Sequence, residues 1–281
     1  MDASMLRYSI LDPTGNITAI VESPVEIASQ PAVAGAIMRR HPAVEQVGFL
    51  KRLTDGESAC AQLRMAGGEF CGNASMSAAA LLLSQSARKS GGTTLRLRVS
   101  GAAEPVVLHL RSEGEDAWLA EIVMPQALGI AETAIAFGGL HGTLPLVRME
   151  GISHLVVEAN SCFFGLLNDR PAAEQAVREF CGMLHADGLG LLFLDGDGTE
   201  RRMTPLVYVP GSGTCFWENS CASGSAAVGI WLASKAGRAS ALSLCEPGGV
   251  LWVQCDPKSG ETLLRGHVRL TERLEIPEAE L

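Results

Sequence analysis

The sequence lacks an excess of positive charge and any dense cluster of Lys and Arg. Its 281 residues include 22 Lys and Arg against 31 Asp and Glu, which gives a formal net charge of −9 and an isoelectric point near 5.2. Nucleic-acid binding requires basic side chains gathered against the phosphates. The composition therefore disfavours a nucleic-acid partner and favours a small-molecule ligand.

Long apolar runs are also missing. No segment reaches transmembrane length without charges or glycines, and Met1–Arg7 lacks the basic patch and apolar run of a signal peptide. These absences predict a cytoplasmic protein with no membrane partner.

The cysteines do not follow the spacing of a disulfide framework or of a zinc site, and no His pair lies at ligand spacing near them. We therefore expect reduced thiols and no metal. The eight are Cys60, Cys71, Cys162, Cys181, Cys215, Cys221, Cys245 and Cys255.

Phosphate and calcium loops are absent too. Gly211–Thr214 is rich in glycine but lacks the Lys-Ser/Thr of a phosphate cradle, and no Gly-x-Gly-x-x-Gly opens a strand-helix unit. Asp195–Glu200 has Glu where a calcium loop needs its turn glycine, so it predicts a hairpin turn.

What the chain does contain is one segment that occurs twice. Glu69–Ala79 and Glu218–Ala227 each place one Cys before small residues that lead into an apolar helix. A helix start offers free N–H groups and a positive dipole end, which lower a thiol pKa and attract a carboxylate. Cys71 and Cys221 are therefore candidate proton-transfer groups around one carboxylate-bearing substrate.

These two helix starts, Cys71-Gly72-Asn73-Ala74 and Cys221-Ala222-Ser223-Gly224, resemble those of the diaminopimelate epimerase-like, cofactor-independent amino-acid racemases. Within that superfamily the chain is most similar to the histidine racemases of staphylopine-type metallophore synthesis. Further matching segments lie in the same order along nearly the whole chain: Asp12–Asn16, Glu45–Phe49, Met124–Ala127, Trp217–Cys221 and Pro247–Gly249.

The resemblance implies an α+β fold of two pseudo-symmetric domains, each a curved, mainly antiparallel sheet wrapped round a central helix. We place the N-terminal half at 1–126, completed by the C-terminal strand 266–281, and the C-terminal half at 127–265. Helices at 73–87 and 222–235 are apolar nearly all round, which favours a buried position for both. A shorter helix is expected at 31–40. Strands are expected within 6–21, 46–50, 93–99, 106–110, 117–123, 155–157, 190–194, 206–209, 251–254 and 266–270.

The resemblance also implies roles for other side chains. His154 matches a His that neighbours a catalytic thiol, and Glu218 matches an acid that precedes the second Cys. Asn16, Gln46 and Asn73 match amides that line the substrate pocket and can bind both ends of a zwitterion. Backbone N–H groups of Gly72, Asn73, Ala222 and Ser223 would bind the carboxylate. Neither a metal nor pyridoxal phosphate is implied, and related enzymes are often homodimers.

The segment before the second Cys departs from the epimerase pattern. Diaminopimelate epimerases carry a Glu-Arg pair there, and its Arg fits the distal carboxylate of the substrate. Val209–Asn219 contains no Arg or Lys. The aromatic side chains Phe70, Phe216 and Trp217 offer flat apolar surface that suits an imidazole ring instead.

We therefore expect a two-base racemase that interconverts L- and D-histidine for an opine-type metallophore pathway. Two alternatives remain open: a racemase or epimerase of another amino acid, diaminopimelate included, and a non-catalytic amino-acid-binding domain. A phenazine-biosynthesis-type isomerase of the same fold would lack the two thiols.

Overall fold

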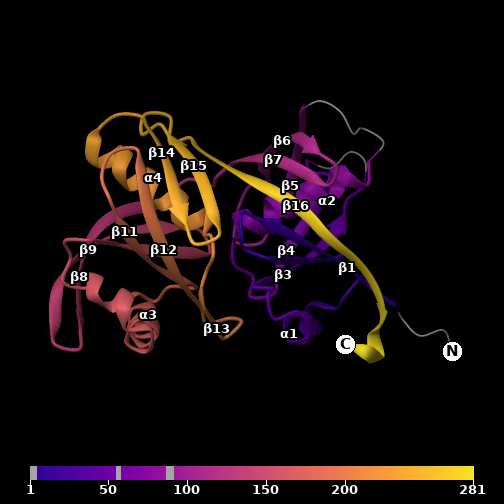
Figure 1. Ribbon diagram of the computed structural model, residues 1–281, viewed down its shortest axis with the longest axis horizontal. Helices are drawn as coiled ribbons and strands as arrows, with labels where there is room; N and C mark the ends of the chain where they lie inside the picture. The colour runs from indigo at the N-terminus through magenta and orange to yellow at the C-terminus, as the bar shows by residue number, and fades with distance from the viewer. Residues whose placement is uncertain (1–4, 55–57, 87–91) are drawn as a thin grey trace. The chain divides into compact units, whose positions relative to one another are not determined.

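The chain divides into two compact units (Figure 1). The computed structural model describes residues 5–54, 58–86 and 92–281. Unit 1 comprises Met1–Val123 and Arg265–Leu281, and unit 2 comprises Met124–Leu264. The boundaries expected from the sequence fell after Gln126 and Arg265, slightly further along the chain.

Unit 1 is built on a closed barrel of eight strands. The order is β1-β2-β3-β4-β5-β6-β7-β16, and β16 pairs with β1 to complete the ring. Closure leaves no open edge in this sheet. The bounds are β1 Met5–Pro13, β2 Thr18–Val21, β3 Gln46–Arg52, β4 Ala61–Met65, β5 Gly92–Val99, β6 Val106–Gly114, β7 Ala117–Val123 and β16 Thr262–Pro277, which enters unit 1 at Arg265.

Two helices of unit 1 lie on opposite sides of this sheet. Helix α1 (Gln30–Arg40), which follows the short 3-10 helix η1 (Ile27–Ser29), packs on the outer face against β3. Helix α2 (Gly72–Ser84) contacts β1, β2, β3, β5, β6 and β7, and every residue from Gly72 to Leu83 is buried. A helix surrounded by strands must be apolar on all sides, which explains its run of Ala and Leu.

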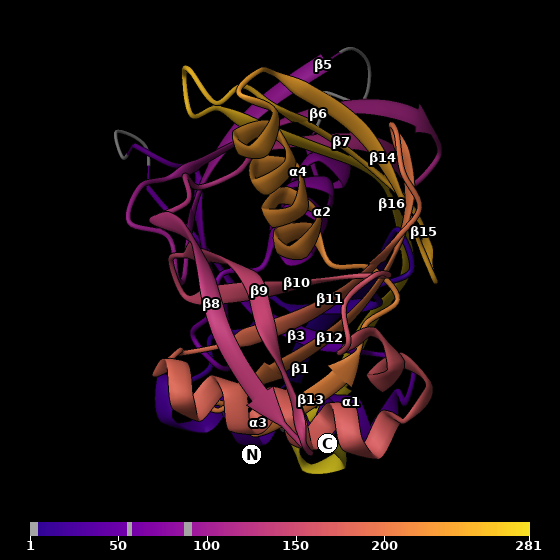
Figure 2. The same ribbon diagram turned by 90° about the vertical axis from the view of Figure 1, so that its left-hand side faces the viewer.

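Unit 2 repeats this plan with a curved sheet in the order β15-β14-β12-β11-β10-β9-β8, and β13 pairs with β12. Figure 2 shows α4 inside the curve of these strands, and it contacts β9, β10, β14 and β15. Helix α3 packs on the other face, against β11 and β12. The bounds are β8 Gly129–Phe137, β9 Leu140–Met149, β10 Ile152–Glu158, β11 Leu189–Asp195, β12 Glu200–Val209, β13 Thr214–Trp217, β14 Ser240–Glu246, β15 Gly249–Cys255, α3 Arg170–Leu184 and α4 Ala222–Ala236, with the 3-10 helix η2 Phe164–Asn168. The last 3-10 helix, η3 (Glu278–Glu280), belongs to unit 1.

Each unit contains two parallel strand pairs in an otherwise antiparallel sheet. In unit 1 they are β2–β3 and β4–β5, joined through α1 and α2. In unit 2 they are β10–β11 and β12–β14, joined through α3 and, after β13, through α4. Parallel neighbours need a long crossover, and a helix supplies it. In both units the first crossover helix lies outside the sheet and the second lies inside.

The predicted fold class is confirmed, whereas several elements were not foreseen. Helix α3 was missed although Asp169 caps it and its buried residues Ala173, Ala176, Val177, Phe180 and Cys181 follow helical spacing. The strands β4, β8, β9, β13 and β14 were also missed. Asp195–Glu200 does join β11 to β12 as a hairpin. In the described part of the chain, no helix is long and apolar enough to cross a membrane.

The close packing of α4 against the sheet yields a stability prediction. A Cβ on Gly229 of α4 would lie 2.4 Å from Val253 Cγ1, whereas a Cβ on Gly182 of α3 would meet nothing within 4 Å. Ala is favoured over Gly in a helix by about 1 kcal/mol, and overpacking costs about 1–3 kcal/mol. Gly182→Ala should therefore raise the free energy of unfolding, and Gly229→Ala should lower it. Denaturant unfolding of both variants measures this, and equal stabilisation by the two substitutions would contradict the packing described.

Candidate active site

The thiol of Cys71 caps the start of α2. Cys71 has extended backbone angles (φ −135°, ψ 112°), and its Sγ accepts a hydrogen bond from Ala74 N–H at 3.3 Å. The Sγ–H group donates to Gln46 Oε1 at 2.5 Å. The Cys71 side chain, which is 8% exposed, therefore lies between a helix start and an amide oxygen.

Gln46 and Asn16 lie at neighbouring strand ends, as expected from the turn after β1. Thr18, the first residue of β2, is paired in register with Gln46 at the start of β3. Asn16 is fully buried, and its Nδ2 donates to Glu45 Oε2 at 3.0 Å. The sequence did not indicate this contact between Asn16 and Glu45, the residue that precedes Gln46. Gly72 and Asn73 follow as the first residues of α2.

Cys221 caps α4 in nearly the same geometry. Its backbone angles are φ −131° and ψ 100°, and its Sγ accepts from Gly224 N–H at 3.4 Å. A Cβ on Gly224 would lie 3.1 Å from this sulfur and 2.7 Å from Leu192 Cδ2. Glycine at 224 therefore leaves the space that the thiol occupies. The predicted residues Ala222 and Ser223 form the first turn of the helix.

His154 is joined to Cys221 through Ser223. The imidazole Nε2 lies 3.1 Å from Ser223 Oγ, which lies 3.6 Å from Cys221 Sγ. His154 is fully buried, and burial lowers its pKa to about 3, so the ring is neutral at physiological pH.

Gly190 of β11 makes room for this ring. It is paired in register with His154 of β10, and a Cβ there would lie 2.3 Å from His154 Nδ1. Sequence reasoning assigned no role to Gly190, because its partner lies on a different strand.

Two acids surround the second thiol. Burial raises the pKa of Cys221 well above its usual range, and the negative charges of Glu218 and Glu246 raise it further. A hydrogen bond with Glu218 acts in the same direction, and one with Ser223 opposes it. Glu218 was expected near the thiol, and its own backbone N–H donates to Pro205 O at 3.0 Å. Glu246 was not foreseen.

The aromatic residues do not lie as the sequence suggested. The indole ring of Trp217 stacks on Phe193 at 5.8 Å between ring centroids, and Arg170 lies over it at 5.0 Å. Its Nε1–H donates to Glu174 Oε1. The interpretation of Trp217 as a free apolar surface for substrate is therefore wrong, because the ring packs against α3. Phe70 is also buried, at 2% exposure.

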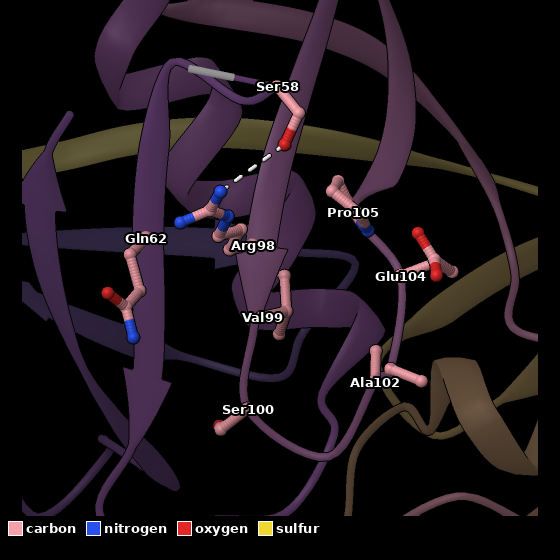
Figure 3. Close-up of a pocket in the computed structure, with 9 residues that line it drawn as sticks. Ser58, Gln62, Arg98, Val99, Ser100, Ala102, Glu104 and Pro105 are labelled. Carbon is pink, nitrogen blue, oxygen red and sulfur yellow. Dashed lines mark hydrogen bonds between the residues drawn. The ribbon is translucent and has the colours of Figure 1, made fainter. Parts of the chain in front are cut away.

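Two cavities on unit 1 are separate from these residues. One of about 380 Å³ is lined by Gln62, Arg98, Ser100 and Glu104, among others, and Arg98 donates to Ser58 there (Figure 3). The second, of about 800 Å³, lies near Arg7, Lys51 and Arg64. None of the predicted site residues lines either cavity. Within residues 5–54, 58–86 and 92–281, no group of three or more His, Cys, Asp or Glu side chains is arranged to hold a metal ion.

The two thiol-capped helix starts are therefore matched structures, one in each unit. In both, the Sγ accepts the N–H three residues later, and Ser75 or Ser225 donates its N–H to the carbonyl of the Cys, at 3.0 and 2.8 Å. Each arrangement combines a thiol with helix N–H groups, which is suited to moving a proton next to a bound carboxylate.

Comparisons with known proteins identify a family and several relatives of this chain. Residues 5–275 match the family described as the histidine racemase CntK N-terminal domain. A histidine racemase of Fusobacterium nucleatum subsp. nucleatum is 29% identical over 272 residues, which cover 95% of this chain and 94% of that protein. A histidine racemase of Staphylococcus aureus is 27% identical over 275 residues, with 95% and 96% coverage.

Solved structures share the fold. A structure described as a predicted epimerase from Pseudomonas aeruginosa has a TM-score of 0.68 at 19% identity and covers 96% of this chain and 99% of its own. A hydroxyproline epimerase from Agrobacterium vitis has a TM-score of 0.68 at 13% identity, with 98% and 92% coverage. At these identities the likeness establishes the fold alone.

The contact between Gly190 and His154 predicts a coupled effect on stability. Gly190→Ala should lower the free energy of unfolding by about 1–3 kcal/mol, since the methyl group displaces the imidazole ring. In a His154→Ala background the same substitution should cost much less. Gly188→Ala is the matched control, because a Cβ there meets its nearest atom at 3.4 Å. Additive effects of Gly190→Ala and His154→Ala in a double-mutant cycle would contradict the contact.

Proposed function

Because the chain belongs to the histidine racemase CntK N-terminal domain family, and is thus an amino-acid racemase, we propose that it interconverts L- and D-histidine through two bases, Cys71 and Cys221. The observation that carries the proposal is the thiol-capped start of a buried helix, which occurs once in each unit with the same hydrogen-bond pattern. A two-base racemase needs two groups that exchange the roles of acid and base, and two equivalent thiols meet that need.

In the proposed reaction, the thiolate of one Cys takes the α-proton from one face of the substrate. The electron pair of the broken C–H bond stays on the substrate as a carbanion, and the thiol of the other Cys delivers its proton to the opposite face. The elevated pKa of Cys221 favours its protonated form in the free enzyme. Because the two thiols exchange roles after each turnover, the reverse reaction uses the same groups.

In this proposal the two helix starts also stabilise the negative charge of the substrate. Backbone N–H groups of Gly72, Asn73, Ala222 and Ser223 would bind the substrate carboxylate and stabilise the growing negative charge. The proposed reaction requires neither a metal ion nor pyridoxal phosphate. The amides of Asn16, Gln46 and Asn73 would hold the zwitterion, donating to the carboxylate and accepting from the ammonium group.

His154 and Glu218 would act on the second thiol. The neutral imidazole of His154 contacts Ser223, which contacts Cys221 in turn. The carboxylate of Glu218 makes Cys221 a weaker acid and would pair with the substrate ammonium group.

The proposal also covers the cellular location, the oligomeric state and the pathway of the enzyme. All eight cysteines are free, which supports a reducing compartment such as the cytoplasm. A homodimer and a place in opine-type metallophore biosynthesis rest on the resemblance to racemases of that kind. A D-amino acid is the product that such a pathway would consume.

Replacement of either thiol tests the mechanism. Cys71→Ser and Cys221→Ser should each abolish racemisation, because a Ser hydroxyl is a far weaker acid and a poor base near neutral pH. Circular dichroism measures inversion of L- and D-histidine directly. Cys181→Ser, in α3, is the matched thiol control, and addition of a chelator to the wild type is a second control that should leave turnover intact. If either Cys variant at the helix starts kept near wild-type turnover, that thiol would have no place in the mechanism.

Substrate choice gives a second test. We expect kcat/KM for histidine to exceed that for meso- or L,L-diaminopimelate by about a thousandfold. A second carboxylate would lose its water without gaining an Arg partner in Val209–Asn219, and an unpaired buried charge costs several kcal/mol. Steady-state kinetics with both substrates, and with the other common amino acids as a reference set, supply the comparison. Comparable values for diaminopimelate would overturn the assignment of histidine.

A further inference from the structure

Glu246 is a buried acid whose contacts the proposed reaction does not use. It ends β14 and is 7% exposed. Its Oε2 accepts the backbone N–H of Cys221 at 2.7 Å, and its Oε1 accepts the hydroxyl of Ser225 at 2.5 Å. One carboxyl group thus holds the Cys that caps α4 and a residue of the first turn of that helix.

The turn after β14 adds a second connection to the same loop. Gly248 N–H donates to Asn219 O at 2.7 Å. The loop Asn219–Cys221 is therefore tied at both ends to the segment Glu246–Gly248. Because the backbone of Cys221 sets the direction of its Cα–Cβ bond, these bonds hold the thiol where Gly224 N–H reaches its Sγ.

In unit 1 the loop before Cys71 is held by hydroxyl groups. After β5, Ser100 Oγ donates to Glu69 O at 2.8 Å and accepts Met65 N–H at 2.9 Å. In α2, Ser75 occupies the position of Ser225, but its hydroxyl donates to the carbonyl of Cys71 at 2.7 Å. On the Cys221 side the connection runs through the carboxyl group of Glu246.

We propose that Glu246, together with Ser225, is a positioning residue that aims the Cys221 thiol for proton transfer. This inference rests on the two-base function proposed above. Glu246 does not touch the substrate in this account, and its effect passes through the backbone N–H of Cys221. Burial raises the pKa of Glu246 well above its usual range, and the hydrogen bonds from Ser225 and Cys221 oppose that rise.

Two substitutions of Glu246 distinguish the effect of its hydrogen bonds from the effect of its side-chain volume. Glu246→Gln keeps an acceptor for Cys221 N–H, and its amide can donate to Ser225 Oγ. Glu246→Leu has a similar volume and makes neither bond. A displacement of about 1 Å at a reacting group costs roughly a hundredfold in rate. We expect Glu246→Leu to lose about that factor in kcat with KM little changed, and Glu246→Gln to stay within about tenfold of the wild type. Glu179→Gln, an exposed acid on α3, is the control.

The α-deuterium isotope effect distinguishes positioning from a loss of folded protein. If Cys221 is misaimed, its proton transfer becomes the slow step. The isotope effect on kcat/KM should then rise for the enantiomer that Cys221 deprotonates and fall for the other. A reduced fraction of folded enzyme would change neither. The proposal is overturned if Glu246→Leu keeps wild-type kcat, if its isotope effects for both enantiomers stay unchanged, or if Glu246→Gln loses as much as Glu246→Leu.

A substrate-free readout keeps this test independent of the proposed reaction. The rate of Cys221 alkylation by iodoacetamide, followed by peptide mapping with Cys71 as the internal reference, should change in Glu246→Leu and stay near wild type in Glu246→Gln. An unchanged Cys221 rate in Glu246→Leu overturns the positioning role. Wild-type protein that fails to racemise histidine but gives the expected alkylation pattern would reject the proposed function, and only the claim that Glu246 holds the Cys221 thiol in place would stand.

Discussion

The hydrogen bond from a helix N–H group to a cysteine sulfur is the contact on which the candidate site depends. It is made by Ala74 with Cys71 and by Gly224 with Cys221, at 3.3 and 3.4 Å. In this position a thiol completes the helix start and remains next to the other free N–H groups of the first turn. At the second helix start the residue three positions on must be small, because a Cβ on Gly224 would lie 3.1 Å from the sulfur.

The position of these helix starts explains why α2 and α4 are apolar and why the sheets round them are curved. A helix that presents a thiol from the interior of a curved sheet must be apolar on every side, and the strands round it must bend enough to enclose it. In each unit the second crossover helix meets this requirement, while the first, α1 or α3, covers the outer face. The stable sheet holds the helix start in place, and the strand ends supply polar side chains such as Gln46 and Glu246.

Sequence reasoning succeeded where the information is local. The two Cys segments, the buried helices and the fold class follow from repeated motifs, helical composition and the resemblance they carry. It failed where a contact joins distant residues. Glu246 reaches Cys221 across 25 positions and Gly190 makes room for His154 from a neighbouring strand, so neither pattern is visible along the chain. Trp217 was misassigned because its proximity to Cys221 in sequence says nothing about which face of β13 its ring occupies.

The central claim is that two different groups act on the two faces of one α-carbon, and isotope incorporation in deuterium oxide tests it most directly. Starting from L-histidine and stopping early, mass spectrometry of the separated enantiomers measures deuterium in each. The account predicts that the D-histidine formed carries solvent deuterium at the α-carbon while the remaining L-histidine carries almost none, because the group that takes the proton differs from the group that returns one. Equal deuterium in the two enantiomers from the first turnovers, or D-histidine that retains the original proton, would indicate a single base and contradict the account.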